Sequence, residues 1–262
     1  MPDNERPWAK VFHDDDGAAA RIQLEQIEAR SFVLGSSMRF DPPFPLPGFP
    51  DRALRLAPED LIPPKDGRPD PDGVARTDLT SVPGAFRWFL STYGVHTPAA
   101  LLHDRLIGDT RLEEVSDTDA DRLFRLMLEA LGVPFLRRWL MWAAVAFGTR
   151  WRAKGPQRAL VALWAVLALA GMGTFVWALV TGNWVVAAVA AVAPIPAAAL
   201  WGEQYGAGLV ASYSAVWLAP PTVLGAIGYV IYWLLETVIA WFIHTFREEP
   251  RQGRSAVPYK DF

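Results

Sequence analysis

The feature that most constrains this chain is a long C-terminal stretch without basic residues. Residues 159–246 contain no Lys or Arg, and their only acidic side chains are Glu203 and Glu236. A helix of a soluble protein carries charge on its solvent face, whereas this stretch is apolar all round. A charge at the centre of the hydrocarbon layer costs about 2.5–3.5 kcal/mol on insertion scales. The sequence therefore predicts an integral, multi-pass membrane protein whose first partner is the lipid bilayer.

About four transmembrane helices are predicted in the region 157–246. The predicted segments are residues 157–180, 184–201, 207–219 and 222–246. The first is long enough to cross a hydrocarbon core of ~30 Å. The third is short, so it is either a span or a re-entrant segment, and Pro220-Pro221 separates it from the fourth.

Basic residues collect on both sides of this region. Arg137, Arg138, Arg150, Arg152, Lys154 and Arg158 precede it, and Arg247, Arg251, Arg254 and Lys260 follow it. Basic flanks favour the cytoplasmic side of a membrane. Both termini, including the tail 247–262, are therefore predicted to be cytoplasmic, which requires an even number of spans. The predicted location is a bacterial plasma (inner) membrane. The start MPDNERPWAK lacks the apolar core of a secretory signal. The N-terminal domain is therefore expected to stay on the side where it is made.

The region before the membrane helices predicts a small α+β domain. Residues 1–30 are acidic and predicted flexible, and a soluble domain is predicted over residues 31–156. It begins with the strand-like SFVLGSSMRF and the Pro- and Gly-rich residues 41–73, and short helices follow Pro83. The predicted fold class is thus α+β, a small β region plus a short-helix bundle, followed by an all-α polytopic membrane domain.

The candidate functional residues lie around a His-Asp dipeptide in this domain, His103-Asp104. At helical spacing His103 lies on an apolar face, with Asp104 about 100° further round. Asp121 shares an apolar stripe of the next helix, so its carboxylate points inward and needs a partner. Antiparallel packing of the two helices would bring Asp121 to His103.

Two interpretations of these residues stay open. In the first, His103 and Asp121 form a buried pair that only joins two helices. In the second, Asp121 orients His103 as a general base, and the oxygens of Asp78 and Asp104 bind a divalent cation, Ca²⁺ or Mg²⁺. The chain has no Cys to supply thiolate ligands for a metal.

The order of the motifs resembles a known family. TDLTSVP is followed by AALLHDRLIG, by DADRLFRLMLEALG and by GVPFLRRW. This order is similar to the phage- and prophage-associated domain-of-unknown-function family thirteen-fifty-three, over roughly residues 31–150. The Pro-rich insertion at 41–73 and the appended membrane region depart from the family pattern. The resemblance implies a prophage or mobile-element protein and names no established activity.

A second resemblance concerns mechanism. The order Asp-Leu, His-Asp, Asp is similar to that of short microbial phospholipases A2. It implies Ca²⁺ held by Asp78, Asp104 and the backbone carbonyl of Leu79, with His103 as the base that activates water and Asp121 orienting it. The absence of flanking Cys, the residues Leu106-Ile107 after the dipeptide, and the cytosolic placement depart from those secreted enzymes.

Three functional hypotheses follow, and the sequence does not decide whether the protein is an enzyme. One is a membrane-tethered, Ca²⁺-dependent phospholipase A2-like esterase acting on phospholipid. Another is a non-enzymatic membrane protein of prophage type, holin-like or scaffolding, for which homo-oligomerisation is left open. Transport through Glu236 has little support because no basic partner is present in the spans. Nucleic acid is not an expected partner, because residues 1–158 hold 21 basic and 23 acidic side chains.

Overall fold

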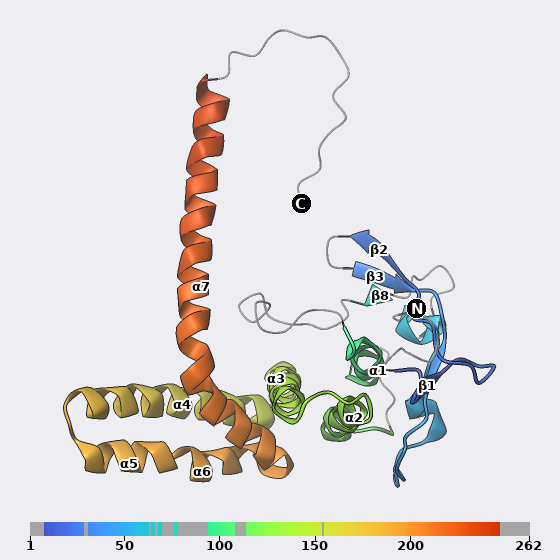
Figure 1. The fold of residues 1–262 in the computed structure, drawn as a ribbon, viewed down its shortest axis with the longest axis horizontal. Coiled ribbons are helices and arrows are strands. Elements are labelled where there is room, and N and C mark those ends of the chain that lie inside the picture. The colour runs from blue at the N-terminus through green and yellow to red at the C-terminus, as the bar shows by residue number, and fades with distance from the viewer. Residues whose placement is uncertain are drawn as a thin grey trace.

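The computed structural model describes residues 8–28, 31–62, 64–65, 68–69, 76–77, 94–107, 114–153 and 155–246. Short strands occupy the first part of the chain and helices the rest, and the strands and the long apolar helices lie at opposite ends (Figure 1). The strands are β1 (Phe12–His13), β2 (Leu24–Glu28), β3 (Ser31–Leu34), β4 (Met38–Phe40), β5 (Arg55–Leu56), β6 (Pro64–Lys65), β7 (Arg68–Pro69) and β8 (Arg76–Thr77). Two 3₁₀ helices, η2 (Asp51–Leu54) and η3 (Pro58–Leu61), flank β5.

The helices follow in a single run along the chain. They are α1 (Thr97–Ile107), α2 (Asp117–Ala130), α3 (Phe135–Arg152), α4 (Pro156–Val180), α5 (Trp184–Val192), α6 (Pro194–Ala197), the 3₁₀ helix η5 (Ala198–Gln204) and α7 (Tyr205–Phe246). The α+β character of the N-terminal half is therefore present, with small sheets and mostly helices.

The strands form two small antiparallel sheets and a hairpin. Their orders are β1-β4-β5, β2-β3-β8 and β6-β7. Within the first sheet Phe12 pairs with Phe40, and both rings are fully buried with their centroids 5.1 Å apart. This sheet provides one wall of the domain core.

The acidic N-terminal segment, predicted to be flexible, contributes to this fold over residues 8–28. The carboxylate of Asp14 accepts hydrogen bonds from the backbone N–H groups of Asp16 and Ala18 at 3.1 and 2.8 Å, which closes a turn. The acidic run therefore stabilises a turn between ordered segments. Phe12, two residues before Asp14, is part of the core. The folded domain begins earlier than the predicted residue 31.

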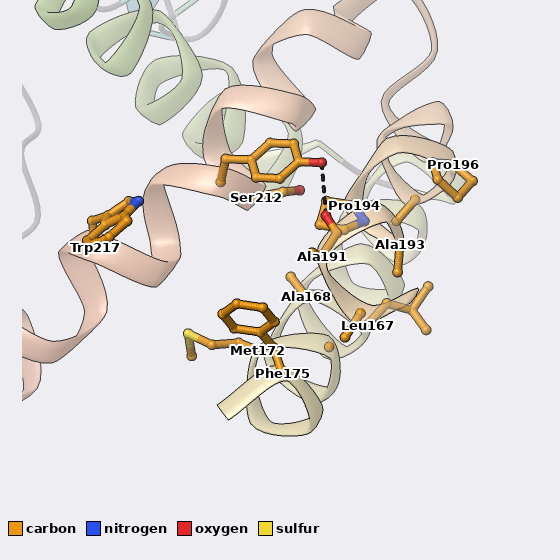
Figure 2. Close-up of a pocket in the computed structure, with 14 residues that line it drawn as sticks. Leu167, Ala168, Met172, Phe175, Ala191, Ala193, Pro194, Pro196, Ser212 and Trp217 are labelled. Carbon is orange, nitrogen blue, oxygen red and sulfur yellow. Dashed lines mark hydrogen bonds between the residues drawn. The ribbon is translucent and has the colours of Figure 1, made fainter. Parts of the chain in front are cut away.

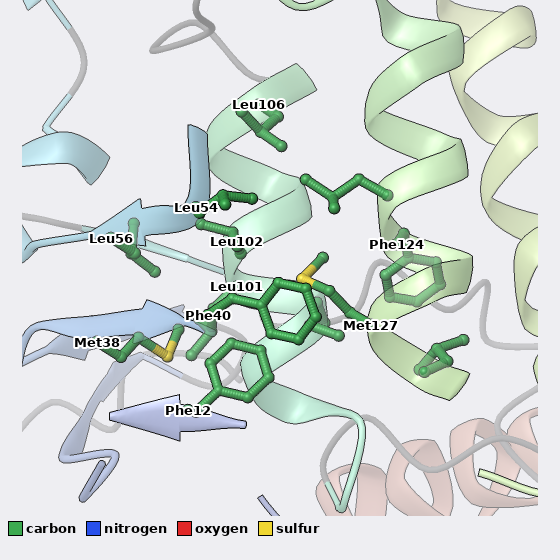
Figure 3. Close-up of a cluster of buried hydrophobic side chains, with 14 of the residues drawn as sticks. Phe12, Met38, Phe40, Leu54, Leu56, Leu101, Leu102, Leu106, Phe124 and Met127 are labelled. Carbon is green, nitrogen blue, oxygen red and sulfur yellow. The ribbon is translucent and has the colours of Figure 1, made fainter. Parts of the chain in front are cut away.

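A single apolar core joins the sheet region to α1 and α2 (Figure 3). Phe12, Phe40 and Leu56 approach from the strands, while Leu102 of α1 and Phe124 of α2 close the core from the other side. All five side chains are buried. Burial of an aliphatic or aromatic side chain stabilises a fold by about 1.5–3 kcal/mol, so this core fixes α1 and α2 against the sheets.

The ends of α2 are as the sequence predicts. Ser116 caps the helix, because its hydroxyl accepts a 3.1 Å hydrogen bond from the backbone N–H of Asp119. Gly132 ends it with a positive φ of 70°. Pro134 then starts α3, as expected. These caps place α1, α2 and α3 side by side.

Helix α3 joins two cores. Met141 belongs to the core shared with the strands, whereas Trp142 and Ala146 pack in a second cluster with Trp164 of α4 and Trp201 of η5. In Figure 1 α3 is seen nearly end-on beside the end of α4. The helix therefore packs on the core of the N-terminal α+β region with one face and on the apolar helices with another.

Among the described residues, three helical segments are long and apolar enough to cross a membrane. They are Pro156–Val180, Trp184–Ala215 and Pro220–Ile243. About four were predicted, and the difference arises in the middle of the region. The predicted second segment and most of the third join into one helical stretch, interrupted only by non-helical geometry at Gly202, where φ is 53°.

The proline pair acts differently from the prediction. Pro220 and Pro221 lie inside α7, which continues through them to Phe246. Proline removes a backbone hydrogen bond and bends a helix without necessarily ending it, and α7 changes direction along its length in Figure 1. Beyond the bend α7 runs away from the α4–α5 hairpin in this view.

Candidate functional site

The predicted contact between His103 and Asp121 is present. The Nε2 atom of His103 lies 2.8 Å from Oδ1 of Asp121, which is hydrogen-bond distance. His103 is 3% exposed and Asp121 is 0% exposed. The imidazole also packs on the ring of Phe124, with centroids 5.2 Å apart. Helical periodicity placed both side chains on inward faces, and antiparallel packing of α1 and α2 brings them together.

Asp121 has two further hydrogen-bond donors, which the sequence analysis did not identify. The Thr149 hydroxyl of α3 donates to Oδ1 at 3.0 Å, and the Gln204 amide of η5 donates to Oδ2 at 2.6 Å. The buried carboxylate thus receives donors from three other elements. These hydrogen bonds to the charged carboxylate offset the free-energy cost of removing it from water.

Arg150 completes the arrangement. Its Nε donates to Oε1 of Gln204 at 2.6 Å, and its Nη2 donates to the backbone carbonyl of Trp201 at 2.5 Å. Burial lowers the pKa of Arg150, while the attraction of Asp121 opposes that shift. The amide of Gln204 therefore bridges a buried carboxylate and a buried guanidinium.

We call these residues the polar joint: His103, Asp121, Thr149, Arg150 and Gln204. They come from α1, α2, α3 and η5, so the joint connects the N-terminal α+β region to the apolar helices. Arg150 was counted at the sequence level only as a positive charge flanking the spans. Gln204 had one usable signal, because it is a rare amide within an otherwise apolar stretch.

Asp104 lies on a different side of α1. Its Oδ2 accepts a 3.0 Å hydrogen bond from the Thr77 hydroxyl of β8, and its side chain is partly exposed. The predicted 100° offset from His103 explains this separation. The structure therefore brings Asp121 to His103 and turns Asp104 toward β8.

The proposed cation ligands are only partly covered by the structure. Asp78 and Leu79 lie outside the described residues. Among the residues that are described, no group of three or more His, Asp or Glu side chains is placed to hold a metal ion. The predicted Ca²⁺ or Mg²⁺ site thus remains a prediction that depends on Asp78.

A separate cavity lies within the apolar helices (Figure 2). It has a volume of about 470 Å³ between α4, the α5–α6 segment and α7. Its lining is apolar apart from the hydroxyls of Ser212 and Tyr213, which already donate to the backbone carbonyls of Gly208 and Ala191. A cavity of this kind suits a hydrocarbon chain and offers no group for acid–base chemistry.

Comparison with known proteins bears on the segment that carries the His–Asp pair. Residues 71–145 match the model of a family described as a protein of unknown function, DUF1353. This segment of the chain belongs to the DUF1353 family. The match confirms the resemblance, over a shorter range than the predicted 31–150. No curated protein and no solved structure matches the chain.

The DUF1353 segment contains only part of the polar joint. His103 and Asp121 lie within it, whereas Thr149, Arg150 and Gln204 follow its end at residue 145. In this chain, therefore, residues outside the family segment supply the remaining partners of its buried carboxylate.

Proposed function

We propose that this chain is an integral membrane protein that holds a DUF1353 domain firmly against the bilayer, and that the polar joint is structural. The observation that supports this most is the environment of Asp121. Its carboxylate is fully buried and accepts hydrogen bonds from His103, Thr149 and Gln204, in three different elements. A carboxylate used in this way fixes the domain to the start of α7.

The burial of His103 argues for this role over catalysis. A general base must lie within hydrogen-bond reach of the proton that it abstracts, directly or through one water. His103 is 3% exposed and directs Nε2 to Asp121. A substrate would have to displace packed side chains of α1 and α2 to reach it.

The membrane setting is part of the proposal. We infer a bacterial plasma membrane, a prophage or mobile-element origin and a cytoplasmic DUF1353 domain, with scaffolding or holin-like assembly as the role. The apolar helices support membrane integration, and the arginines before α4 support the cytoplasmic placement of the domain. Assembly into a homo-oligomer would add the contacts between copies that a holin-like role needs.

A second candidate function rests on the same hydrogen bond. A His–Asp contact of 2.8 Å is the geometry expected of a base and its orienting carboxylate. On this alternative the protein is a Ca²⁺-dependent, phospholipase A2-like hydrolase, with Asp78, Leu79 and Asp104 around the cation. It requires a conformational change that opens His103 to solvent.

One experiment separates the two functions. The full chain is reconstituted in phospholipid vesicles, fatty acid release is followed with and without Ca²⁺, and thermal stability is measured on the same preparations. The informative variant is His103→Gln, whose amide keeps a donor toward Asp121 but cannot act as a base. The control is His103→Ala, which removes both properties.

The structural role predicts no Ca²⁺-dependent release from the wild type. It also predicts a clear loss of stability in His103→Ala and a smaller loss in His103→Gln. Release by the wild type that disappears in the stable His103→Gln variant would contradict the structural role and support the hydrolase.

A further inference from the structure

A second polar cluster lies beside the polar joint, where α2 meets the start of α3. The guanidinium of Arg125 lies between two indole rings, 4.9 Å from the centroid of Trp139 and 4.8 Å from that of Trp142. The two indoles meet edge to face, with centroids 5.3 Å apart. Arg138 extends the cluster and lies 5.6 Å from the ring of Phe135. We call Arg125, Arg138, Trp139 and Trp142 the Arg–Trp cluster.

The cluster is rich in donors that lack acceptors. Buried N–H groups without a hydrogen-bond partner in the described part of the chain include Nε of Arg125, Nε of Arg138, Nε1 of Trp139 and Nε1 of Trp142. Trp142 is itself only 7% exposed. Buried donors are normally paired, and an unpaired one is destabilising. Four such donors in one place call for an acceptor.

The local charge points to an anion. The pKa of Arg125 is lowered by burial and by the neighbouring positive charges of Arg138 and Arg122, against the opposing attraction of Glu129. Glu129 pairs with Arg138 at 3.2 Å and is half exposed. One half-exposed carboxylate among three arginines leaves an excess of positive charge.

The position of the cluster points to the membrane surface. The Cζ3 atoms of Trp139 and Trp142 would lie 3.3 and 3.4 Å from a Cβ placed on Gly206, at the start of α7. Since Nε1 is at the opposite end of an indole from Cζ3, both N–H groups face away from α7. The cluster therefore lies against the start of α7, with its indole N–H groups turned away from that helix.

Two exposed apolar residues stand next to it. Phe135 and Leu136, in the first turn of α3, are 67% and 68% exposed. Large apolar side chains beside arginines are typical of segments that enter the headgroup and acyl boundary of an anionic membrane. α3 lies across the end of the α4–α5 hairpin in Figure 1, which suits a helix at the interface.

We propose that the Arg–Trp cluster binds the phosphate of an anionic phospholipid headgroup, with Phe135 and Leu136 inserted beside it. The planar guanidinium of Arg125, held between two rings, presents paired N–H donors that match phosphate oxygens. The indole N–H groups and Arg138 supply further donors. The inference rests on the proposed membrane location but not on the role of the polar joint, whose residues lie outside the cluster.

The test uses the full chain purified in a mild detergent. Its melting temperature is measured on adding short-chain phosphatidylglycerol, short-chain phosphatidylcholine or inorganic phosphate. The variants are Arg125→Gln and Arg125→Lys. The lysine keeps the positive charge but lacks the paired N–H donors of the guanidinium. Arg158→Gln is the matched control, because Arg158 also lies over an indole, 5.5 Å from the ring of Trp151, but is exposed and forms no cluster of unpaired donors.

The expected result is a higher melting temperature with phosphatidylglycerol than with phosphatidylcholine. The difference should be lost in Arg125→Gln, reduced in Arg125→Lys and kept in Arg158→Gln. Equal effects of the two lipids, or an equal loss in Arg158→Gln, would overturn the proposal. If inorganic phosphate raised the melting temperature as much as phosphatidylglycerol does, the assignment of the anion to a lipid headgroup would be overturned.

If Arg125→Gln does not fold, Arg125→Lys and Trp139→Phe carry the test, since Trp139→Phe removes one donor and keeps a ring. Vesicle association of the protein through its apolar helices is measured separately. A protein that integrates into vesicles but shows no lipid preference would overturn the headgroup site alone, whereas failure to integrate would overturn the membrane proposal.

Discussion

Gln204 donates a 2.6 Å hydrogen bond to Asp121, although the two residues are 83 positions apart in the chain. Asp121 lies inside the DUF1353 segment, and Gln204 lies between the α5–α6 segment and α7. The same amide accepts a hydrogen bond from Arg150. One side chain therefore links α2 of the N-terminal α+β region, the bridging helix α3 and the apolar helices.

Gln204→Leu should lower the stability of the full chain. The change leaves Oδ2 of Asp121 and Nε of Arg150 without this partner in a buried site, and an unsatisfied buried polar group costs about 1–3 kcal/mol. The measurement is the melting temperature in detergent. Gln157→Leu is the control, because Gln157 is exposed at the start of α4. Equal melting temperatures for the two variants would show that the polar joint does not hold the two parts together.

Gly208→Ala should disturb the contact between α7 and η5. A Cβ at this position would lie 2.6 Å from Cδ1 of Trp201, and that indole is fully buried and cannot swing away. Overpacking of this kind costs about 1–3 kcal/mol. Gly228→Ala is the matched control on the same helix, since nothing lies within 4 Å of its Cβ position. The melting temperature should be lower for Gly208→Ala and unchanged or higher for Gly228→Ala. The reverse order would contradict this packing.

Ser116→Ala should destabilise the soluble domain by about 1 kcal/mol, the usual effect of losing an N-cap. The Ser116 hydroxyl accepts from the backbone N–H of Asp119 and also donates to the carboxylate of Asp119 at 2.6 Å. Thr118→Ala, two residues further along in the first turn of α2 and without a capping role, should change stability by less than about 0.5 kcal/mol. Chemical denaturation of both variants provides the comparison. A Thr118→Ala effect as large as that of Ser116→Ala would argue against the cap.

Cysteine labelling should place both ends of the chain in the cytoplasm. The chain has no native Cys, so single substitutions need no altered background. Ala18→Cys and Ser255→Cys should both resist a membrane-impermeant maleimide in intact cells and react after lysis, because basic residues flank the membrane region on both sides.

This outcome requires that one of the three apolar segments does not complete a crossing. The second half of α7, which extends away from the α4–α5 hairpin in Figure 1, is the segment expected not to cross. Labelling of Ser255→Cys in intact cells, with Ala18→Cys protected, would instead show an odd number of crossings.

The sequence by itself determined the features that depend on local patterns. The absence of Lys and Arg from residues 159–246 predicted apolar membrane helices, because charge is excluded from hydrocarbon whatever the tertiary contacts. The periodicity of α1 and α2 predicted that His103 and Asp121 face inward, and their hydrogen bond follows from antiparallel packing. Ser116, Gly132 and Pro134 predicted helix ends, since capping depends only on neighbouring residues.

Only the tertiary structure decided what surrounds Asp121. Thr149, Arg150 and Gln204 are far from it in the sequence, and no local pattern specifies which distant side chain will satisfy a buried carboxylate. Long-range partners are selected by the packing of whole elements, here by α3 lying between the domain core and the apolar helices, and that packing also places Arg125 between its two indole rings.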